Sequence, residues 1–173
     1  VYIREEDGFG LRPNIGIRGA AAERSQKVTI MRDGVLITPA PYSAPAAYYI
    51  PNVSRIASVE VLKGPAATAY GPHTVGGAIN LASPSIPEGD SKGFVDLSVG
   101  SDGYYKGQAS YGATKGNFGY VVDLLSYGAD GFKRVDRSNQ DTGFERNDIG
   151  IKVAYALPQS RFEHRLSFLL EVG

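Results

Sequence analysis

The sequence predicts a mainly β protein in which a glycine-rich N-terminal part is followed by a series of antiparallel strands. Eleven tyrosines, seven phenylalanines, 22 glycines and no tryptophan favour strands joined by tight turns over helices. Beyond residue 93, five segments alternate apolar with polar side chains, a period of two that is typical of strands with one apolar face. No stretch approaches the ~18 apolar residues that a membrane-spanning helix requires.

Charge and cysteine content exclude several classes of function. The 18 Lys and Arg balance 18 Asp and Glu, so no basic face indicates nucleic acid as a partner. The absence of cysteine excludes disulfides and thiol catalysis, and two distant histidines, His73 and His164, are too few for a multi-histidine metal site. Residues 1–7 lack the basic-then-apolar pattern of a secretory signal, so we expect the chain to begin inside a longer precursor.

The first part of the chain predicts short strands joined by turns. Turn signals stand at residues 7–8 (Asp-Gly) and 12–14 (Arg-Pro-Asn), and the Asp-Gly pair at 33–34 predicts a hairpin between two apolar runs. In the run IGIR (15–18), isoleucines alternate with glycine and arginine. This period of two places Arg18 on the face of the predicted strand opposite the isoleucines.

The densest glycine-rich stretch lies between two short β-prone runs, VEVL (59–62) and AINL (78–81). Gly-Pro, Tyr-Gly-Pro and Gly-Gly steps between these runs interrupt any regular element. The pattern predicts a strand, an irregular loop and a return strand. We expect the backbone of this segment to pass close to another group. A phosphate-binding loop is excluded because Pro-His follows Gly71, where such a loop requires lysine. A dinucleotide fingerprint is excluded because no helical period follows.

Residues 38–52 combine proline and tyrosine. The segment holds four of the ten prolines and three tyrosines, Tyr42, Tyr48 and Tyr49. Proline at this density predicts a stiff, non-helical loop. Tyrosine rings favour burial and their hydroxyls need partners. The segment is therefore either a linker or a pre-ordered loop that meets a polar ligand.

A Pro/Ser/Gly connector at 83–93 is the best domain boundary in the sequence. The connections between the five alternating segments after it are short at 100–104, 114–117 and 158–160 and long at 128–147. Short turns on one side and longer loops on the other are typical of outer-membrane barrels. A soluble sandwich gives the same alternation, so the period of the strands alone does not separate the two folds.

Four motifs, in order, resemble the plug domain of TonB-dependent outer-membrane receptors: IGIRG (15–19), VTIMRDGVLI (28–37), VEVLKGP (59–65) and YGPHTVGGAIN (70–80). The run APYSAPAAYYIP (40–51) is similar, more narrowly, to ferric-citrate receptors. The resemblance implies a mainly β fold, an α+β plug followed by about five antiparallel strands of a barrel of about 22 strands. It divides the chain into an N-terminally truncated plug at 1–86, a connector at 87–93 and C-terminally truncated barrel strands at 94–173.

The function that this resemblance implies is transport, not catalysis. Such a receptor binds an iron chelate, here iron(III) dicitrate, outside a Gram-negative cell and imports it across the outer membrane into the periplasm. The implied partners are the chelate, outer-membrane lipid and the TonB protein, which supplies energy through a segment that is missing here. Iron arrives as part of the substrate, so no cofactor and no protein-bound metal are expected.

The resemblance also implies roles for particular residues. Arg18 and Lys63, which stands where many members have arginine, are expected to lock the plug to acidic residues of the barrel wall. Plug loops would form the floor of the ligand site, and we expect polar ligand contacts from Tyr42, Ser43, Thr68 and His73. A histidine in such a position is more often a packed or hydrogen-bonded loop residue than a ligand, which is the alternative interpretation of His73. The expected structural turn glycines are Gly19, Gly34, Gly64, Gly71, Gly76 and Gly77.

Three alternatives stay open at this point. One is a TonB-dependent receptor for another siderophore, haem or cobalamin. Another is a secreted all-β binding module, such as an adhesin or carbohydrate-binding sandwich, which explains the alternation but not the ordered motifs. The last is a hydrolase, because Gly107 to Gly112 around Ser110 misses a nucleophile elbow by one residue, although this run lies in a strand pattern.

Overall fold

The computed structural model describes residues 1–5, 9–11, 13–37, 50–71, 74–131, 142–157 and 165–172. The chain divides into two compact units, Val1–Pro84 and Ser85–Gly173. No helix among the described residues is long and apolar enough to span a membrane.

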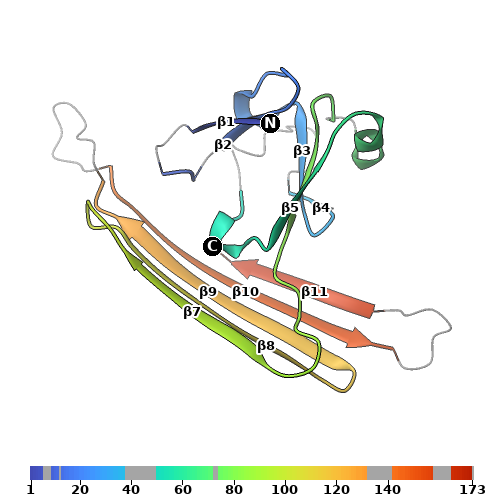
Figure 1. Ribbon diagram of the computed structural model, residues 1–173, viewed down its shortest axis with the longest axis vertical. Coiled ribbons are helices and arrows are strands. Elements are labelled where there is room, and N and C mark those ends of the chain that lie inside the picture. Colours follow the sequence, from blue (N-terminus) through green and yellow to red (C-terminus); the bar gives the residue numbers. More distant parts are fainter. Residues whose placement is uncertain are drawn as a thin grey trace. The chain divides into compact units, whose positions relative to one another are not determined.

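The first unit is built on a mixed four-stranded sheet (Figure 1). Its strand order is β4-β3-β6-β5, and β3 and β6 run parallel while the other neighbours are antiparallel. The bounds are β3 Val28–Arg32, β4 Val35–Leu36, β5 Ser58–Leu62 and β6 Gly77–Ala82. A separate antiparallel pair consists of β1 Tyr2–Glu5 and β2 Pro13–Gly16. Short 3-10 helices are η1 Glu23–Ser25, η2 Val53–Arg55 and η3 Pro65–Tyr70.

The core of this unit lies on both faces of β3, which is buried over its whole length. Val28 and Ile30 enter a cluster of buried side chains with Ile17, Ile79 and Leu81. Met31 enters a second cluster, with Ala67 of η3 and Ala78 of β6. A strand buried on both faces reads as a continuous apolar run, which explains why VTIM shows no alternation.

Two local predictions for this unit are wrong. Pro13 and Asn14, predicted in a turn, form the start of β2, where the missing proline N–H is tolerated because Pro13 is the first residue of the strand. The predicted strand through Arg18 ends earlier, at Gly16, and Arg18 with Gly19 turns the chain at positive φ angles of 59° and 76°. The expected hairpin at Asp33-Gly34 is confirmed, with φ angles of 48° and 80° at the turn.

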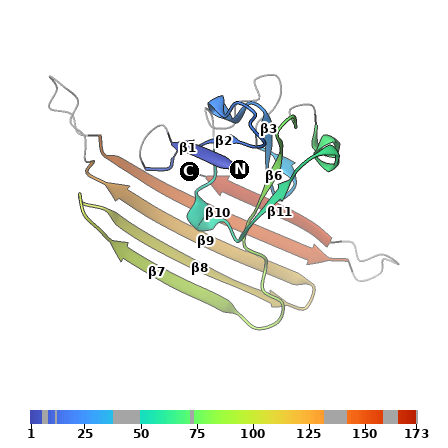
Figure 2. The same ribbon diagram turned by 45° about the horizontal axis from the view of Figure 1, so that its top comes forward.

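The second unit is an antiparallel meander of five strands, as predicted (Figure 2). Each strand pairs with the next in sequence, giving the order β11-β10-β9-β8-β7. The predicted loop at 128–147 is shorter in the structure, because β9 continues to Ala129 and β10 starts at Phe144. The bounds are β7 Lys92–Val99, β8 Tyr105–Lys115, β9 Phe118–Ala129, β10 Phe144–Ala156 and β11 Arg165–Val172.

The register gathers the predicted apolar positions on one face of this sheet. Val95 pairs with Ala109, Ala109 with Leu124, and Leu124 with Ile149, so one row of apolar residues crosses four strands. Many of these side chains face solvent: Leu97 is 78% exposed and Phe168 is 63% exposed. A water-exposed apolar band of this size has to be covered by an apolar environment.

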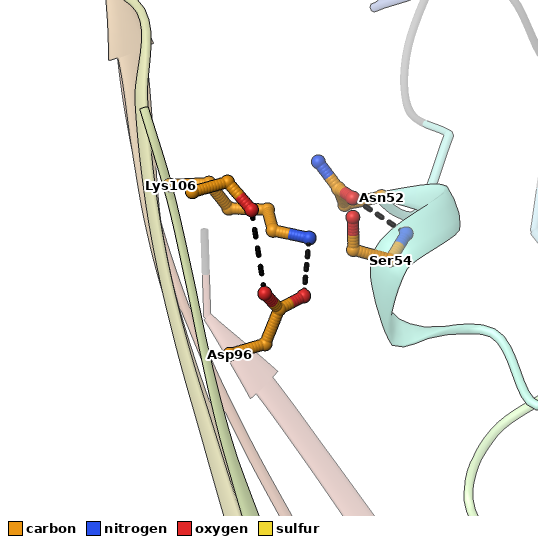
Figure 3. Close-up of polar contacts among 5 residues, drawn as sticks. Asn52, Ser54, Asp96 and Lys106 are labelled. Atoms are coloured by element: carbon orange, nitrogen blue, oxygen red, sulfur yellow. Dashed lines mark hydrogen bonds and ion pairs between the residues drawn. The ribbon is translucent and has the colours of Figure 1, made fainter. Parts of the chain in front are cut away.

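The opposite face of the sheet carries polar and charged side chains. Lys106 Nζ lies 2.6 Å from Asp96 Oδ2 across the β7–β8 pair (Figure 3). Arg146 Nε lies 3.0 Å from Asp148 Oδ2 along β10. Polar alternation with an apolar outer face is the pattern of a barrel wall that faces a hydrated interior.

The connector before β7 packs on this polar face. Ile86 is 5% exposed and forms a small cluster with Val121 and Ala154. The Thr114 hydroxyl donates a hydrogen bond of 2.6 Å to the carbonyl oxygen of Pro87. The sequence-based plug boundary at residue 86 therefore falls inside the second unit, because Ile86 is anchored to these strands.

Candidate functional site

The glycine-rich segment of the first unit forms the predicted strand, excursion and return strand. β5 and β6 pair antiparallel, with Leu62 opposite Ala78. Between them, η3 starts after Gly64 and ends before Gly71, which have φ angles of 80° and 115°. Because left-handed and extended positive φ angles are accessible chiefly to glycine, these two residues set the ends of the excursion. The 3-10 helix itself was not predicted, since six residues are too few for a periodic signal.

The Gly76-Gly77 step is the point of closest approach that the sequence predicted. A Cβ atom on Gly76 would lie 3.1 Å from the carbonyl oxygen of Lys27 and 3.2 Å from that of Ile17. A Cβ atom on Gly77 would lie 2.5 Å from the carbonyl oxygen of Leu62. The Gly76 N–H donates a hydrogen bond of 2.8 Å to Lys27 O. The group that this Gly-Gly step approaches is therefore the backbone of the same unit. The segment allows the strands of the sheet to come close together.

Arg18 and the Lys63-Gly64 step, which lie far apart in sequence, meet in the structure. The Nη1 atom of Arg18 lies 3.4 Å from the position of a Cβ atom on Gly64. The guanidinium group therefore extends over Gly64, next to Lys63. Both Arg18 and Lys63 are exposed. The exposed guanidinium group of Arg18 can interact with a carboxylate or another anion.

The predicted ligand residues are only partly described. Thr68 is exposed on η3, and its hydroxyl donates a hydrogen bond of 2.6 Å to the carbonyl oxygen of Pro65. This bond holds the hydroxyl against the helix while leaving its oxygen able to accept a further hydrogen bond. Tyr42, Ser43 and His73 lie outside the described residues.

A polar clamp that sequence reasoning missed ties the β3–β4 turn to β6. The Ser83 hydroxyl and N–H donate hydrogen bonds of 2.6 and 2.9 Å to the carboxylate of Asp33. The Gly34 N–H donates a bond of 2.9 Å to Asn80 Oδ1, and the Asn80 amide donates one of 3.1 Å to Glu60. No local signal predicts these contacts, because the partners are separated by 20 to 50 positions.

Two buried arginines in the first unit were also missed. Arg55, at the end of η2, is 1% exposed and Arg32, in β3, is 6% exposed. Sequence alone predicts exposure for arginine, because this residue type is rarely buried. A buried guanidinium group is stable only when hydrogen-bond acceptors surround it, so the packing around Arg32 and Arg55 has to be specific.

No metal site is found where the chain is described, and Ser110 does not lie at a nucleophile elbow. No group of three or more His, Cys, Asp or Glu residues in that part of the chain could hold a metal ion. Ser110 lies in the middle of β8, opposite Phe94 on one side and Asp123 on the other. A nucleophile elbow requires a strand-to-helix turn, so the hydrolase alternative fails at this position.

A separate cavity of about 630 Å³ lies beside β1 and β2. Its lining includes the charged residues Arg4, Glu5 and Glu23 together with Asn14. The oxygen of the Asn14 side chain accepts a hydrogen bond of 2.6 Å from the Arg24 N–H. Thr68, the one predicted ligand residue that the structure describes, does not line this cavity.

Comparison with known proteins identifies the family. Residues 1–78 match the family model described as TonB-dependent Receptor Plug Domain. The vitamin B12 transporter BtuB of Photobacterium profundum is 31% identical over 146 residues, which cover 84% of this chain and 22% of that protein. This chain carries a TonB-dependent receptor plug domain. The resemblance seen in the plug motifs is thereby confirmed at the level of the family.

Solved structures of TonB-dependent receptors share the fold. The ferric yersiniabactin uptake receptor FyuA of Yersinia pestis matches with a TM-score of 0.74 and 24% identity, over 98% of this chain and 26% of that one. The siderophore receptor PirA of Acinetobacter baumannii matches with a TM-score of 0.63 and 19% identity, over 98% and 27%. The chain therefore spans about a quarter of these relatives.

TonB-dependent receptors lie in the outer membrane of Gram-negative bacteria, which confirms the predicted location. The second unit exposes one apolar face, the pattern that strands of an outer-membrane barrel present to lipid. A soluble adhesin-like sandwich, which explained the alternation equally well, is excluded by the plug domain.

Proposed function

We propose that the receptor to which this chain belongs binds an iron chelate at its extracellular side and imports it into the periplasm with energy from TonB. The observation that supports this most strongly is the plug domain at residues 1–78, followed by strands with one apolar and one polar face. A tight site cannot release its ligand unaided, so import requires a second plug conformation with weaker binding. The receptor changes the location of its substrate and not its covalent structure, so we assign no enzymatic role.

The substrate that we propose is iron(III) dicitrate. Its support is the run APYSAPAAYYIP at 40–51, which is similar to ferric-citrate receptors. Ferric citrate is anionic, yet residues 38–52 and 64–75 contain no arginine and no lysine. We therefore infer that the plug contributes hydrogen-bonding groups, from Tyr42, Ser43, Thr68 and His73, and that barrel loops contribute the cations.

A second candidate substrate is a cobalamin or a siderophore complex. The observation that favours it is the similarity to a vitamin B12 transporter and to a ferric yersiniabactin receptor. Both candidates use the same plug and the same energy source, so they differ only in which loops provide the ligand contacts.

We also propose that Arg18 and Lys63 lock the plug by binding acidic side chains of the complete barrel. The support is that the Arg18 guanidinium group extends over Gly64, the residue after Lys63, and that both cations are exposed. An arginine fork binds a carboxylate through two parallel hydrogen bonds, whereas lysine contributes a point charge. Arg18 is therefore the stronger member of the pair.

Ligand titration of the full-length receptor in detergent tests the substrate. Ferric citrate is compared with a ferric siderophore, cyanocobalamin and iron-free citrate in the same preparation. We expect saturable binding of ferric citrate and none of iron-free citrate. Binding of cobalamin or the siderophore complex instead would contradict the proposed substrate while retaining the proposed transport function.

The Tyr42→Ala variant tests the proline-tyrosine loop, with Tyr42→Phe as the matched control. We expect Tyr42→Ala to weaken ferric citrate binding by about tenfold, the effect of one buried ring and its hydrogen bond. Tyr42→Phe keeps the ring and should show an intermediate loss. Equal affinity of both variants and the wild type would remove this loop from the ligand site.

A further inference from the structure

The outward face of the second unit carries a hollow of about 480 Å³ across β7, β8 and β9. This volume lies within the ~300–1,000 Å³ typical of small-molecule sites. Its lining is apolar apart from one serine, Ser110, and the outward-facing members are Gly93, Val95, Ala109, Tyr111, Val122 and Leu124.

Two small residues create the hollow. Gly93 lies opposite Tyr111 in the β7–β8 pair, and Ala109 lies between Val95 and Leu124 in the adjoining row. The Cδ2 atom of Tyr111 lies 3.1 Å from the position of a Cβ atom on Gly93, so the tyrosine ring leans over the glycine and forms one wall. Larger side chains at Gly93 and Ala109 would fill the space.

A cation lies at the end of the same face. Lys115, the last residue of β8, has the same orientation as Tyr111, because the two are separated by an even number of residues. At the rise of a strand, about 13 Å separates them. Lys115 is exposed and forms no ion pair with any residue that the structure describes.

Aromatic rings surround this end of the sheet. Tyr120 packs between Tyr111 and Phe118, with ring centroids 6.3 Å apart in both pairs. Tyrosines and lysines gather where a bilayer changes from hydrocarbon to head groups. The turn that joins β8 to β9 is short, whereas residues 130–143 connect β9 to β10, so the Lys115 end is the periplasmic one.

We propose that this hollow binds one acyl chain of an anionic phospholipid from the periplasmic leaflet, with Lys115 holding its phosphate. The lining contains no charged side chain, which suits an acyl chain. Lys115, which forms no ion pair with any described residue, lies about 13 Å along the strand from Tyr111 at the wall of the hollow. The site is independent of the transported substrate. It rests on the outer-membrane location and on the geometry of β7 to β9.

Photo-crosslinking tests the site in the full-length receptor in nanodiscs. The probe is phosphatidylglycerol with a diazirine on one acyl chain, and labelled peptides are identified by mass spectrometry. We expect labelling to concentrate on peptides that contain Gly93 to Val95 and Ala109 to Tyr111. Ala109→Leu should reduce that labelling by about tenfold, the effect of losing contact with about two methylene groups.

Gly107→Val is the matched control, because Gly107 lies on the same strand and face as Ala109, on the side away from Lys115, and does not line the hollow. It should leave labelling unchanged, and heat-modifiable gel mobility confirms that both variants fold. Uniform labelling along the outward face, or an equal loss in both variants, would overturn the proposal and indicate ordinary bilayer lipid.

A variant outside the hollow tests the head-group contact independently. Lys115→Gln should abolish the preference for labelling by the phosphatidylglycerol probe over a phosphatidylcholine probe that carries the same diazirine chain. Equal labelling of the wild type by the two probes would overturn the assignment of Lys115 to the phosphate.

Discussion

Among the described glycines of the plug, Gly77 is the one at which an added side chain would meet backbone most closely. Its φ angle is 148°, a conformation that favours glycine, and an added Cβ atom would lie 2.5 Å from Leu62 O. Both features disfavour any other residue at this position. The glycine-rich motif predicted a close approach, but the approaching group could not be predicted. Leu62 lies across the sheet, and its register with β6 depends on the whole excursion through η3.

Replacement of Gly77 by alanine should loosen the β5–β6 pair. We expect the free energy of opening this pair to fall by about 2 kcal/mol, since steric contact adds to backbone strain. Hydrogen exchange of β5 and β6 amides in the full-length receptor measures the effect. Gly71→Ala is the control, because its φ angle is also positive, at 115°, but no atom lies within 4 Å of its Cβ position. Equal loss of protection in both variants would contradict the steric account.

Arg18 adopts a backbone conformation that suits glycine better. A φ angle of 59° costs a non-glycine residue about 1 kcal/mol. Retention of arginine under strain is consistent with a role for its side chain, which the proposed lock provides.

The variant Arg18→Gly separates the turn from the lock. It relieves the backbone strain but removes the guanidinium group, so we expect increased passive leak of large antibiotics through the full-length receptor. Arg24→Gly is a matched control, since Arg24 is exposed in the same unit and has a φ angle of 49°. If Arg18→Gly leaks no more than Arg24→Gly, Arg18 has no part in holding the plug.

Among the elements, the five strands of the second unit were the most predictable. One apolar face imposes a period of two, and the register places the predicted apolar residues of neighbouring strands in common rows. The strand ends were less predictable. β9 runs through Gly128 and Ala129, where alternation stops, because pairing with Phe144 and Glu145 continues the ladder.

The connector shows what periodicity does not reveal. A Cβ atom on Gly119 would lie 2.8 Å from Ile86 Cγ2, and one on Gly112 would lie 3.0 Å from Pro87 Cδ. These glycines leave a flat surface on which Ile86 and Pro87 lie. A sequence shows two glycines in strands but not the segment that covers them.

Gly119→Val should displace the connector from the strands. We expect the free energy that holds the connector on the strands to fall by about 1–3 kcal/mol, as for other overpacked sites. Limited proteolysis of the full-length receptor at residues 85–91 reports the change as faster cleavage. Gly107→Val is the control, because the nearest atom to its Cβ position is Leu97 Cδ2 at 3.6 Å. Cleavage at the wild-type rate in Gly119→Val would show that the connector is held elsewhere.

At the scale of the whole molecule, sequence motifs predicted the family and the order of the plug and strands. Arg18 and Lys63 were predicted by resemblance, and the structure brings Arg18 to the residue after Lys63. The clamp of Asp33 and Ser83 was not predictable, because single polar residues carry no information about distant partners. The assignment of ferric citrate as the substrate depends on one run of residues, 40–51, and is therefore a proposal.

Uptake of radioactive iron measures the proposed energy-dependent import most directly. Cells that lack their own ferric-citrate receptor express the full-length protein, and uptake of iron supplied as ferric citrate is compared with and without TonB. We predict saturable uptake that requires TonB. Uptake that continues at the same rate without TonB would contradict the account, because the plug would then open without the partner that is proposed to drive it.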